Sequence, residues 1–277
     1  MLWSRIIWLF IMFILGRHLC FPSYSSERYL ELADSASYYM SIESWDNAEQ
    51  KIIEALRLEP ANFSNSMLLA NLGLIQTHNK KYHEAIKTLT LGLNIAPSSS
   101  VLLNNRAHAY LYVDSLSAAA QDLDRSLELD SVQEWPLQTR AFIYLHENQL
   151  DEAKSLLVSM KKFFPENANV YSAFASIAEK EGDYVSAKEN YIKSLEINPE
   201  DEDVYASYIM LLIVSDQYSE ARSVIKKALD INPENSVFYL LRGFLHKLNF
   251  RMDEAEADKK IAISKGADPE MVAKFIP

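Results

Sequence analysis

The feature that most constrains this chain is a 34-residue repeat that fills nearly all of it after residue 28. The triplet Ile-Asn-Pro ends at Pro199 and again 34 residues later. Steps of 34 residues toward the N-terminus reach Pro165, Ser131 and Pro97. Pro60 lies 37 residues before Pro97, a difference that one insertion at Phe63–Asn65 explains. The frame predicts seven units, at 29–62, 66–99, 100–133, 134–167, 168–201, 202–235 and 236–269.

Small residues recur at two positions of every unit. Position 20 is alanine in all seven units: Ala48, Ala85, Ala119, Ala153, Ala187, Ala221 and Ala255. Position 8 is alanine or glycine in six of the seven, with Ile209 as the exception. Each unit also splits into two apolar-periodic segments of about 12–14 residues with a polar turn between them. The pattern predicts two helices a unit, which cross where only small side chains allow close approach.

These residues resemble the tetratricopeptide repeat (TPR) family, whose pattern has small residues at positions 8 and 20 and proline at position 32. The resemblance covers 29–269, with departures at Ile209, at Lys259 and at position 4, where tryptophan never occurs. It implies an all-α, right-handed α-solenoid of about seven helix-turn-helix repeats, extending over 26–277. Because no unit can bury its own apolar face, the units must stack on one another.

The open apolar face of the last unit predicts a short capping helix at the C-terminus, which we place at 270–277 in the division of the chain. Asp268 is expected as its N-cap and Pro269 as its first helical residue. Met271, Val272 and Phe275 are expected to cover the last repeat.

The first 25 residues differ from the rest. A short segment with one positive charge, Met1–Arg5, precedes an unbroken apolar run of eleven residues, Ile6–Gly16. This length is typical of a secretory signal peptide, with cleavage after Ser25, since a membrane-spanning helix needs about 20 apolar residues. Two alternatives remain: an uncleaved anchor over residues 2–21, or lipidation of Cys20. All three predict export to a periplasmic or lumenal compartment, or retention on its membrane.

The resemblance also implies that the first helix of each repeat lines a concave groove. When the family's groove positions are carried over to this sequence, the residues in the middle of the groove are uncharged. They include amides that can pair with a peptide backbone and aromatic rings that can act as anchors. The candidate protein- or peptide-binding residues are Asn71, Asn105, His108, Tyr112, Trp135, Gln138, Phe142 and His146. We expect them on one continuous inner wall.

Several function classes are not supported by the sequence. A formal charge of −11 without a basic run argues against nucleic acid as a partner and favours a neutral or basic protein. No Gly-rich phosphate loop or nucleophile elbow is present, and the one cysteine lies in the N-terminal segment. The histidines lack carboxylates at metal-ligand spacing. We therefore expect no catalytic residues, no metal and no cofactor.

The sequence thus predicts a non-enzymatic scaffold that binds a protein or peptide in an envelope or secretory compartment. One alternative is an assembly subunit that docks on a larger membrane complex through its convex face or repeat edges. An enzyme with an unrecognised site is the other.

Overall fold

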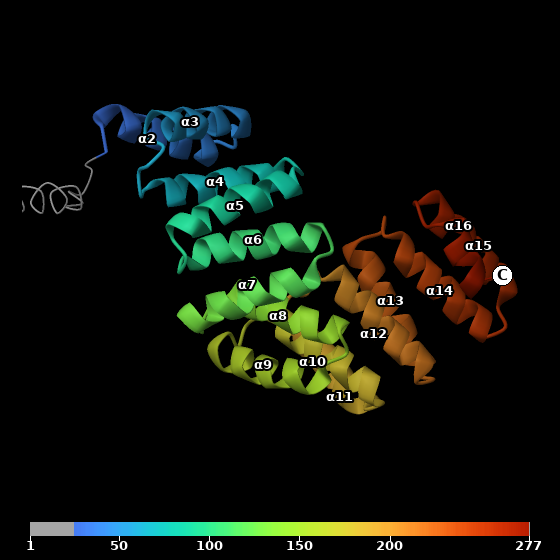
Figure 1. Cartoon of the computed structure of the whole chain (residues 1–277). Helices are drawn as coiled ribbons and strands as arrows, with labels where there is room; N and C mark the ends of the chain where they lie inside the picture. The colour runs from blue at the N-terminus through green and yellow to red at the C-terminus, as the bar shows by residue number, and fades with distance from the viewer. Residues whose placement is uncertain (1–24, 277) are drawn as a thin grey trace, which may run out of the picture. The chain divides into compact units, whose positions relative to one another are not determined.

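The computed structural model describes residues 25–276, which form fifteen helices and no strand. They divide into two compact units, with the boundary between Ser131 and Val132 (Figure 1). The helices follow one another as pairs joined by short turns, as the repeat predicts. The expected signal peptide or anchor lies outside the described residues, except for Ser25. No helix in the described part is both long and apolar enough to cross a membrane.

Unit 1 contains three helix pairs. They are α2 (Glu27–Ser41) with α3 (Trp45–Leu58), α4 (Asn65–His78) with α5 (Tyr82–Ile95), and α6 (Ser100–Tyr112) with α7 (Leu116–Leu129). One core cluster joins Ala36 of α2 and Ile52 of α3 to Leu68 and Ile75 of the next pair. Each pair therefore buries its apolar face against its neighbour, as expected for stacked repeats.

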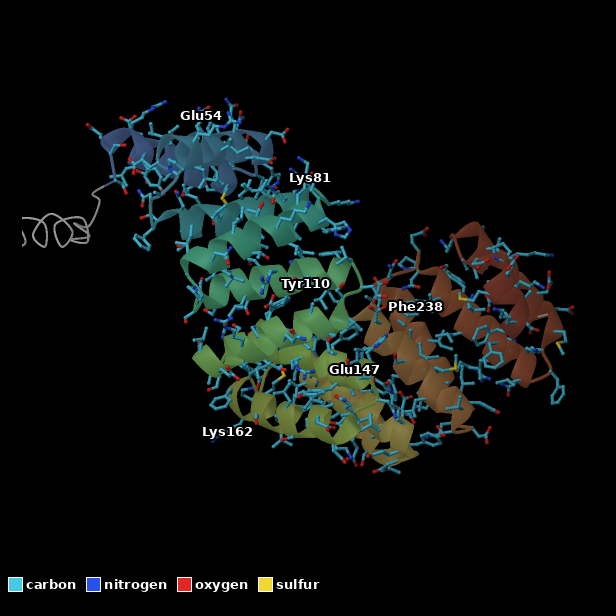
Figure 2. All side chains as sticks on the ribbon, in the orientation of Figure 1. Glu54, Lys81, Tyr110, Glu147, Lys162 and Phe238 are labelled. Carbon is cyan, nitrogen blue, oxygen red and sulfur yellow. The ribbon has the colours of Figure 1, made fainter. Side chains whose placement is uncertain are left out.

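Unit 2 contains four pairs and a last short helix. They are α8 (Glu134–His146) with α9 (Leu150–Phe163), α10 (Ala168–Glu181) with α11 (Tyr184–Ile197), α12 (Glu202–Val214) with α13 (Tyr218–Ile231), α14 (Ser236–Leu248) with α15 (Met252–Ser264), and α16 (Pro269–Phe275). Phe238, labelled in Figure 2, is fully buried in the larger core cluster of this unit. Ile209, the exception at position 8, is fully buried in the same cluster.

The small residues lie where helices of a pair meet. All seven alanines at position 20 are at most 1% exposed. A Cβ atom added to Gly73 would lie 2.4 Å from Leu89, and one added to Gly243 would lie 3.3 Å from the backbone oxygen of Ala255. A Cβ at either glycine would force its neighbours to shift, so packing favours a small residue at Gly73 and Gly243, whereas repeat 6 accommodates Ile209 at position 8.

The turn within each pair has a backbone feature that the sequence analysis missed. One residue of this turn, at position 15 of the repeat, has a positive φ in every pair: Glu43, Lys80, Asp114, Asn148, Gly182, Asp216 and Phe250. Only one of these is glycine, although the left-handed conformation costs an ordinary residue of order 1 kcal/mol or more. The stacking of the repeats therefore holds this turn against the local preference of the side chain.

The capping helix forms as predicted at its start. Asp268 caps it through a bond from the Glu270 amide, and Pro269 is its first residue. Val272 is buried, and the Phe275 ring packs edge-on against Phe244 at 5.3 Å. The expectation for Met271 was wrong, because it remains 37% exposed, and the covering residue is instead Ile276, which contacts the Gly243 position.

Candidate functional site

In unit 1 two predicted residues, His108 and Tyr112, lie one turn apart on α6 and face the same way. The Tyr112 ring stacks on Tyr82 of α5, with centroids 4.6 Å apart and planes within 4°, and the His108 ring meets it edge-on at 5.1 Å. Tyr112 nonetheless remains 55% exposed. Stacking on a neighbouring pair thus fixes an exposed ring in one orientation, which suits a contact residue.

These rings border an open cavity of about 310 Å³ in unit 1. Its lining comes from α4, the start of α5 and the end of α6: Leu74, Thr77, His78, Lys80, Tyr82, His108 and Tyr112. Burial lowers the pKa of His108 below its ordinary value, so its imidazole is neutral at pH 7. Lys80 is therefore the one permanent charge among the lining residues.

The two predicted amides of unit 1 do not line this cavity. The Asn105 side chain donates to the backbone oxygen of Ala70 at 3.3 Å, so it links α6 to α4. Asn71 lies half-buried on α4. Binding of a peptide backbone by these two amides stays a prediction. The hydrogen bond from Asn105 to Ala70 counts against a role of Asn105 in it.

In unit 2 the predicted residues Gln138 and Phe142 lie one turn apart on α8 and border a second cavity, of about 260 Å³. Its lining combines apolar side chains with uncharged polar ones. The apolar lining residues besides Phe142 are Ala141, Leu145, Leu157, Met160, Val170 and Ala173, and the polar ones are Gln138, Asn169, Ser172 and Ser176. Phe142 is 56% exposed at the edge of this cavity. We call this feature the Phe142 cavity.

The other two predicted residues of unit 2 lie outside the lining of this cavity. Trp135 is 38% exposed at the start of α8, and His146 is exposed at its end, with its ring 6.4 Å from that of Phe142. The eight predicted residues are thus divided equally between the two units. Whether they form one continuous wall stays a prediction.

Sequence reasoning missed the parts of both sites that come from second helices. Leu157 and Met160 of α9 line the Phe142 cavity, and Tyr82 of α5 supports Tyr112. Periodic apolar residues on a second helix give no sign that they border a cavity. Tyr82 did carry a signal, because position 17 is aromatic in four of the seven repeats: Trp45, Tyr82, Tyr184 and Tyr218.

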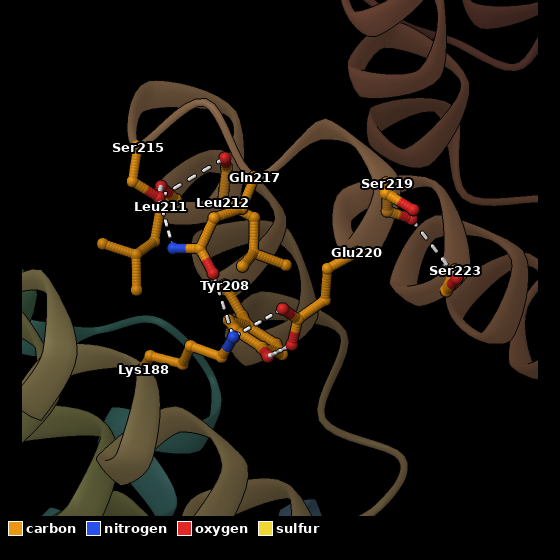
Figure 3. Close-up of polar contacts among 9 residues, drawn as sticks. All are labelled: Lys188, Tyr208, Leu211, Leu212, Ser215, Gln217, Ser219, Glu220 and Ser223. Atoms are coloured by element: carbon orange, nitrogen blue, oxygen red, sulfur yellow. Dashed lines mark hydrogen bonds and ion pairs between the residues drawn. The ribbon is translucent and has the colours of Figure 1, made fainter.

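Unit 2 also contains a polar network that could be mistaken for a catalytic centre. Lys188 of α11, Tyr208 of α12 and Glu220 of α13 meet there (Figure 3), with the Tyr208 hydroxyl donating to Glu220 at 2.8 Å. The hydrogen bonds from Lys188 and Tyr208 lower the pKa of Glu220, whereas burial raises that of Tyr208. Since each group satisfies another, the network joins three helices and leaves no group poised for acid–base work.

Metal binding finds no support in the part of the chain that the structure describes. No group of three or more histidine, cysteine, aspartate or glutamate side chains between residues 25 and 276 is arranged to hold a metal ion.

Comparisons with known proteins agree with the repeat fold. Family models described as tetratricopeptide repeat match residues 68–99 and 178–245. Mouse sperm-associated antigen 1 is 35% identical over 86 residues, which are 31% of this chain but only 9% of that protein.

Solved structures show the same fold at low identity. A tetratricopeptide repeat protein from Parabacteroides merdae superposes with a TM-score of 0.74 at 23% identity, covering 91% of this chain and 98% of that one. YrrB, described as a TPR protein with an unusual peptide-binding site, gives a TM-score of 0.50 at 18% identity, covering 67% of this chain and 96% of its own. The repeated small residues, the helix pairs and these matches together identify tetratricopeptide repeats in this chain.

Proposed function

We propose that this protein is a non-enzymatic scaffold that binds an extended segment of another protein, and that the Phe142 cavity receives an apolar side chain of that segment. The observation that carries the proposal is the composition of the cavity lining, which is mostly apolar with four uncharged polar side chains. Such a lining suits a leucine-, methionine- or phenylalanine-sized anchor flanked by main-chain amides.

The polar lining residues support an extended peptide. Gln138 and Asn169 each carry an amide donor and an amide acceptor, and Ser172 and Ser176 carry hydroxyls. The Gln138 oxygen already accepts from Asn167 at 3.5 Å and the Ser172 hydroxyl donates to the Asn169 backbone oxygen at 3.2 Å, so these two groups would bind a peptide through their remaining capacity. The main chain of an extended peptide carries the complementary groups on both sides of its side chain. YrrB, with its peptide-binding site, is a precedent on the same fold.

The test is a peptide-display selection on the full chain, followed by calorimetric titration of the selected peptides. Phe142→Ala should weaken binding by about 1–2 kcal/mol, because a half-exposed ring at a cavity edge loses its contacts with the anchor. It should leave thermal stability nearly unchanged. Val158→Ala is the matched control, since Val158 is 62% exposed on the second helix of the same repeat.

A second candidate is an assembly subunit that docks through its second helices. Val158 on α9 and Val185 on α11 favour it, because they are 62% and 71% exposed. The same pair of variants separates the two candidates. If Val158→Ala abolishes capture of the partner while Phe142→Ala binds normally, the second helices are the docking surface and the cavity proposal is wrong.

We also propose that residues 1–25 direct export, so that the scaffold acts in an envelope or secretory compartment. The support is the eleven-residue apolar run behind a short positive segment. Cell fractionation tests it. A product shortened by about 25 residues and free of the membrane indicates a cleaved signal peptide, a carbonate-resistant membrane protein indicates an anchor, and full-length cytosolic protein contradicts export.

A further inference from the structure

One edge of unit 1 carries a row of exposed apolar side chains that packing does not explain. Leu30, Met67 and Val101 hold position 2 of their repeats, near the starts of α2, α4 and α6, and are 51%, 61% and 50% exposed. First helices of stacked repeats lie roughly 10 Å apart. The three side chains therefore form a row along the edge where these helices begin.

A fourth apolar residue at this edge comes from the insertion that interrupts the repeat. Phe63, in the loop before α4, is 74% exposed. The loop is well bonded around it, since the Asn65 side chain donates to the Glu59 backbone oxygen at 2.7 Å and accepts from the Tyr29 hydroxyl at 3.0 Å. The insertion thus presents an aromatic ring to the outside on a supported loop. We call Leu30, Phe63, Met67 and Val101 the apolar edge.

The described chain begins at this same edge. The Ser26 amide donates to the Glu59 carboxylate at 2.8 Å, and the Asn62 side chain donates to the Ser25 hydroxyl at 2.8 Å. Ser25 therefore lies against the loop that carries Phe63. Cys20 is five positions earlier in the sequence, a distance of at most about 18 Å for an extended chain. A bilayer that holds the apolar segment upstream is consequently within reach of the apolar edge.

The charge at this edge also suits a lipid surface. In repeats 2 and 3 the apolar side chains are flanked by serines: Ser64, Ser66, Ser98, Ser99 and Ser100. The corresponding loops and helix starts of unit 2 are acidic, with Glu166, Glu200, Asp201, Glu202, Asp203 and Glu234. Repeat 1 does carry carboxylates at this edge, with exposed Glu27 and Glu31 beside Leu30 and Glu59 at the base of the Phe63 loop. Because anionic headgroups repel carboxylates, the serine-flanked part of the edge around Met67 and Val101 can approach a membrane more closely than the acidic helix starts of unit 2.

We propose that the apolar edge of unit 1 rests on the bilayer that retains the N-terminal segment, with Phe63 and Met67 in the interfacial layer. Exposed aromatic and aliphatic side chains enter this layer readily, and contact with it adds to a single anchor. The partner is thus a lipid surface, which the apolar edge meets directly. This inference depends on membrane retention of the chain by the anchor over residues 2–21, and is independent of peptide binding by the Phe142 cavity.

The test uses the full chain in vesicles of phosphatidylcholine and phosphatidylglycerol. With Cys20→Ser as background, spin labels are placed at Ser64→Cys, beside Phe63, and at Ser117→Cys, on the opposite edge of unit 1. The label at residue 64 should be several-fold less accessible to a water-soluble nickel complex than the label at residue 117, and more accessible to oxygen. Without vesicles, in detergent solution that contains no bilayer, both labels should be equally accessible to the nickel complex.

Substitutions then link the shielding to the apolar edge. Phe63→Ser combined with Met67→Ser should remove the shielding at residue 64 while leaving thermal unfolding unchanged, because both side chains are exposed. Phe63→Leu should retain it. Equal accessibility of the two labels in vesicles would overturn the proposal, and so would a mature protein released from the membrane. Shielding that persists without lipid would also overturn it, since a protein segment would then cover the edge.

Discussion

Units 1 and 2 are built from the same helix pairs but carry different side chains on their surfaces. Unit 1 carries the apolar edge and an exposed stack of Tyr82 and Tyr112, with serine-rich loops between its repeats. Unit 2 has acidic loops and helix starts, and it joins its helices through buried tyrosine–carboxylate bonds such as that of Tyr208 with Glu220. The comparison teaches that the two units share alanine at position 20 and the positive φ at position 15, whereas their surfaces carry different side chains.

The largest effect should come from the position that both units share. Ala119→Leu in unit 1 and Ala187→Leu in unit 2 each place a large side chain at a fully buried helix crossing. We expect each to lower the free energy of unfolding by about 3 kcal/mol through overpacking. Urea titration measures it, with exposed Ser155→Leu as the control. Equal loss at Ser155 would mean that the repeat register is wrong.

A smaller loss should be specific to unit 2. Glu220→Ala leaves the Tyr208 hydroxyl, in a residue only 4% exposed, without its acceptor. Leaving a buried hydroxyl unpaired costs about 1–2 kcal/mol. Adding Tyr208→Phe to Glu220→Ala removes the unpaired hydroxyl as well. The double variant should therefore recover much of the lost stability. If the double variant is no more stable than Glu220→Ala, the network is not a source of the loss.

His108 of unit 1 and Glu220 of unit 2 should lose their contributions to stability in different pH windows. Burial lowers the pKa of His108, so the unfolded chain binds its proton more readily, and stability is lost as the pH falls below about 6.5. The pKa of Glu220 is lowered by its hydrogen bonds, so its contribution is lost only as the pH falls below about 4.5. Calorimetry of His108→Gln and Glu220→Gln against pH tests this. His108→Gln should flatten the curve in the upper window only, and a change confined to the lower window would contradict the assignment.

The smallest expected effect concerns the turn within each pair. Lys80 in unit 1 and Gly182 in unit 2 occupy the same left-handed position, with φ of 60° and 79°. Gly182→Ala should destabilise by about 1 kcal/mol or less, because the added Cβ meets nothing but the backbone disfavours it. Lys80→Gly should be neutral or slightly stabilising. Chemical denaturation compares them, and a loss for Lys80→Gly larger than that for Gly182→Ala would contradict this account of the turn.

The repeat frame made most of the fold predictable from sequence. Periodic small residues and a capping proline are local signals, so the helix pairs and the start of α16 followed from them. The site was predictable only in part, because Phe142 and Gln138 are recognisable as exposed residues of a first helix. Leu157 and Met160 were not, since whether a second-helix side chain borders a cavity depends on how neighbouring repeats pack. Asn105 illustrates the same limit, because its partner Ala70 lies in another repeat.

The central claim, that the Phe142 cavity of unit 2 receives an apolar anchor, is tested most directly by a double-mutant cycle. Calorimetry would compare a selected peptide with its anchor→Ala form, each against the wild-type chain and Phe142→Ala. The account predicts a coupling energy of about 1 kcal/mol or more, because Phe142 and the anchor touch. Additive effects, with a coupling energy near zero, would show that the anchor binds elsewhere and would contradict the claim.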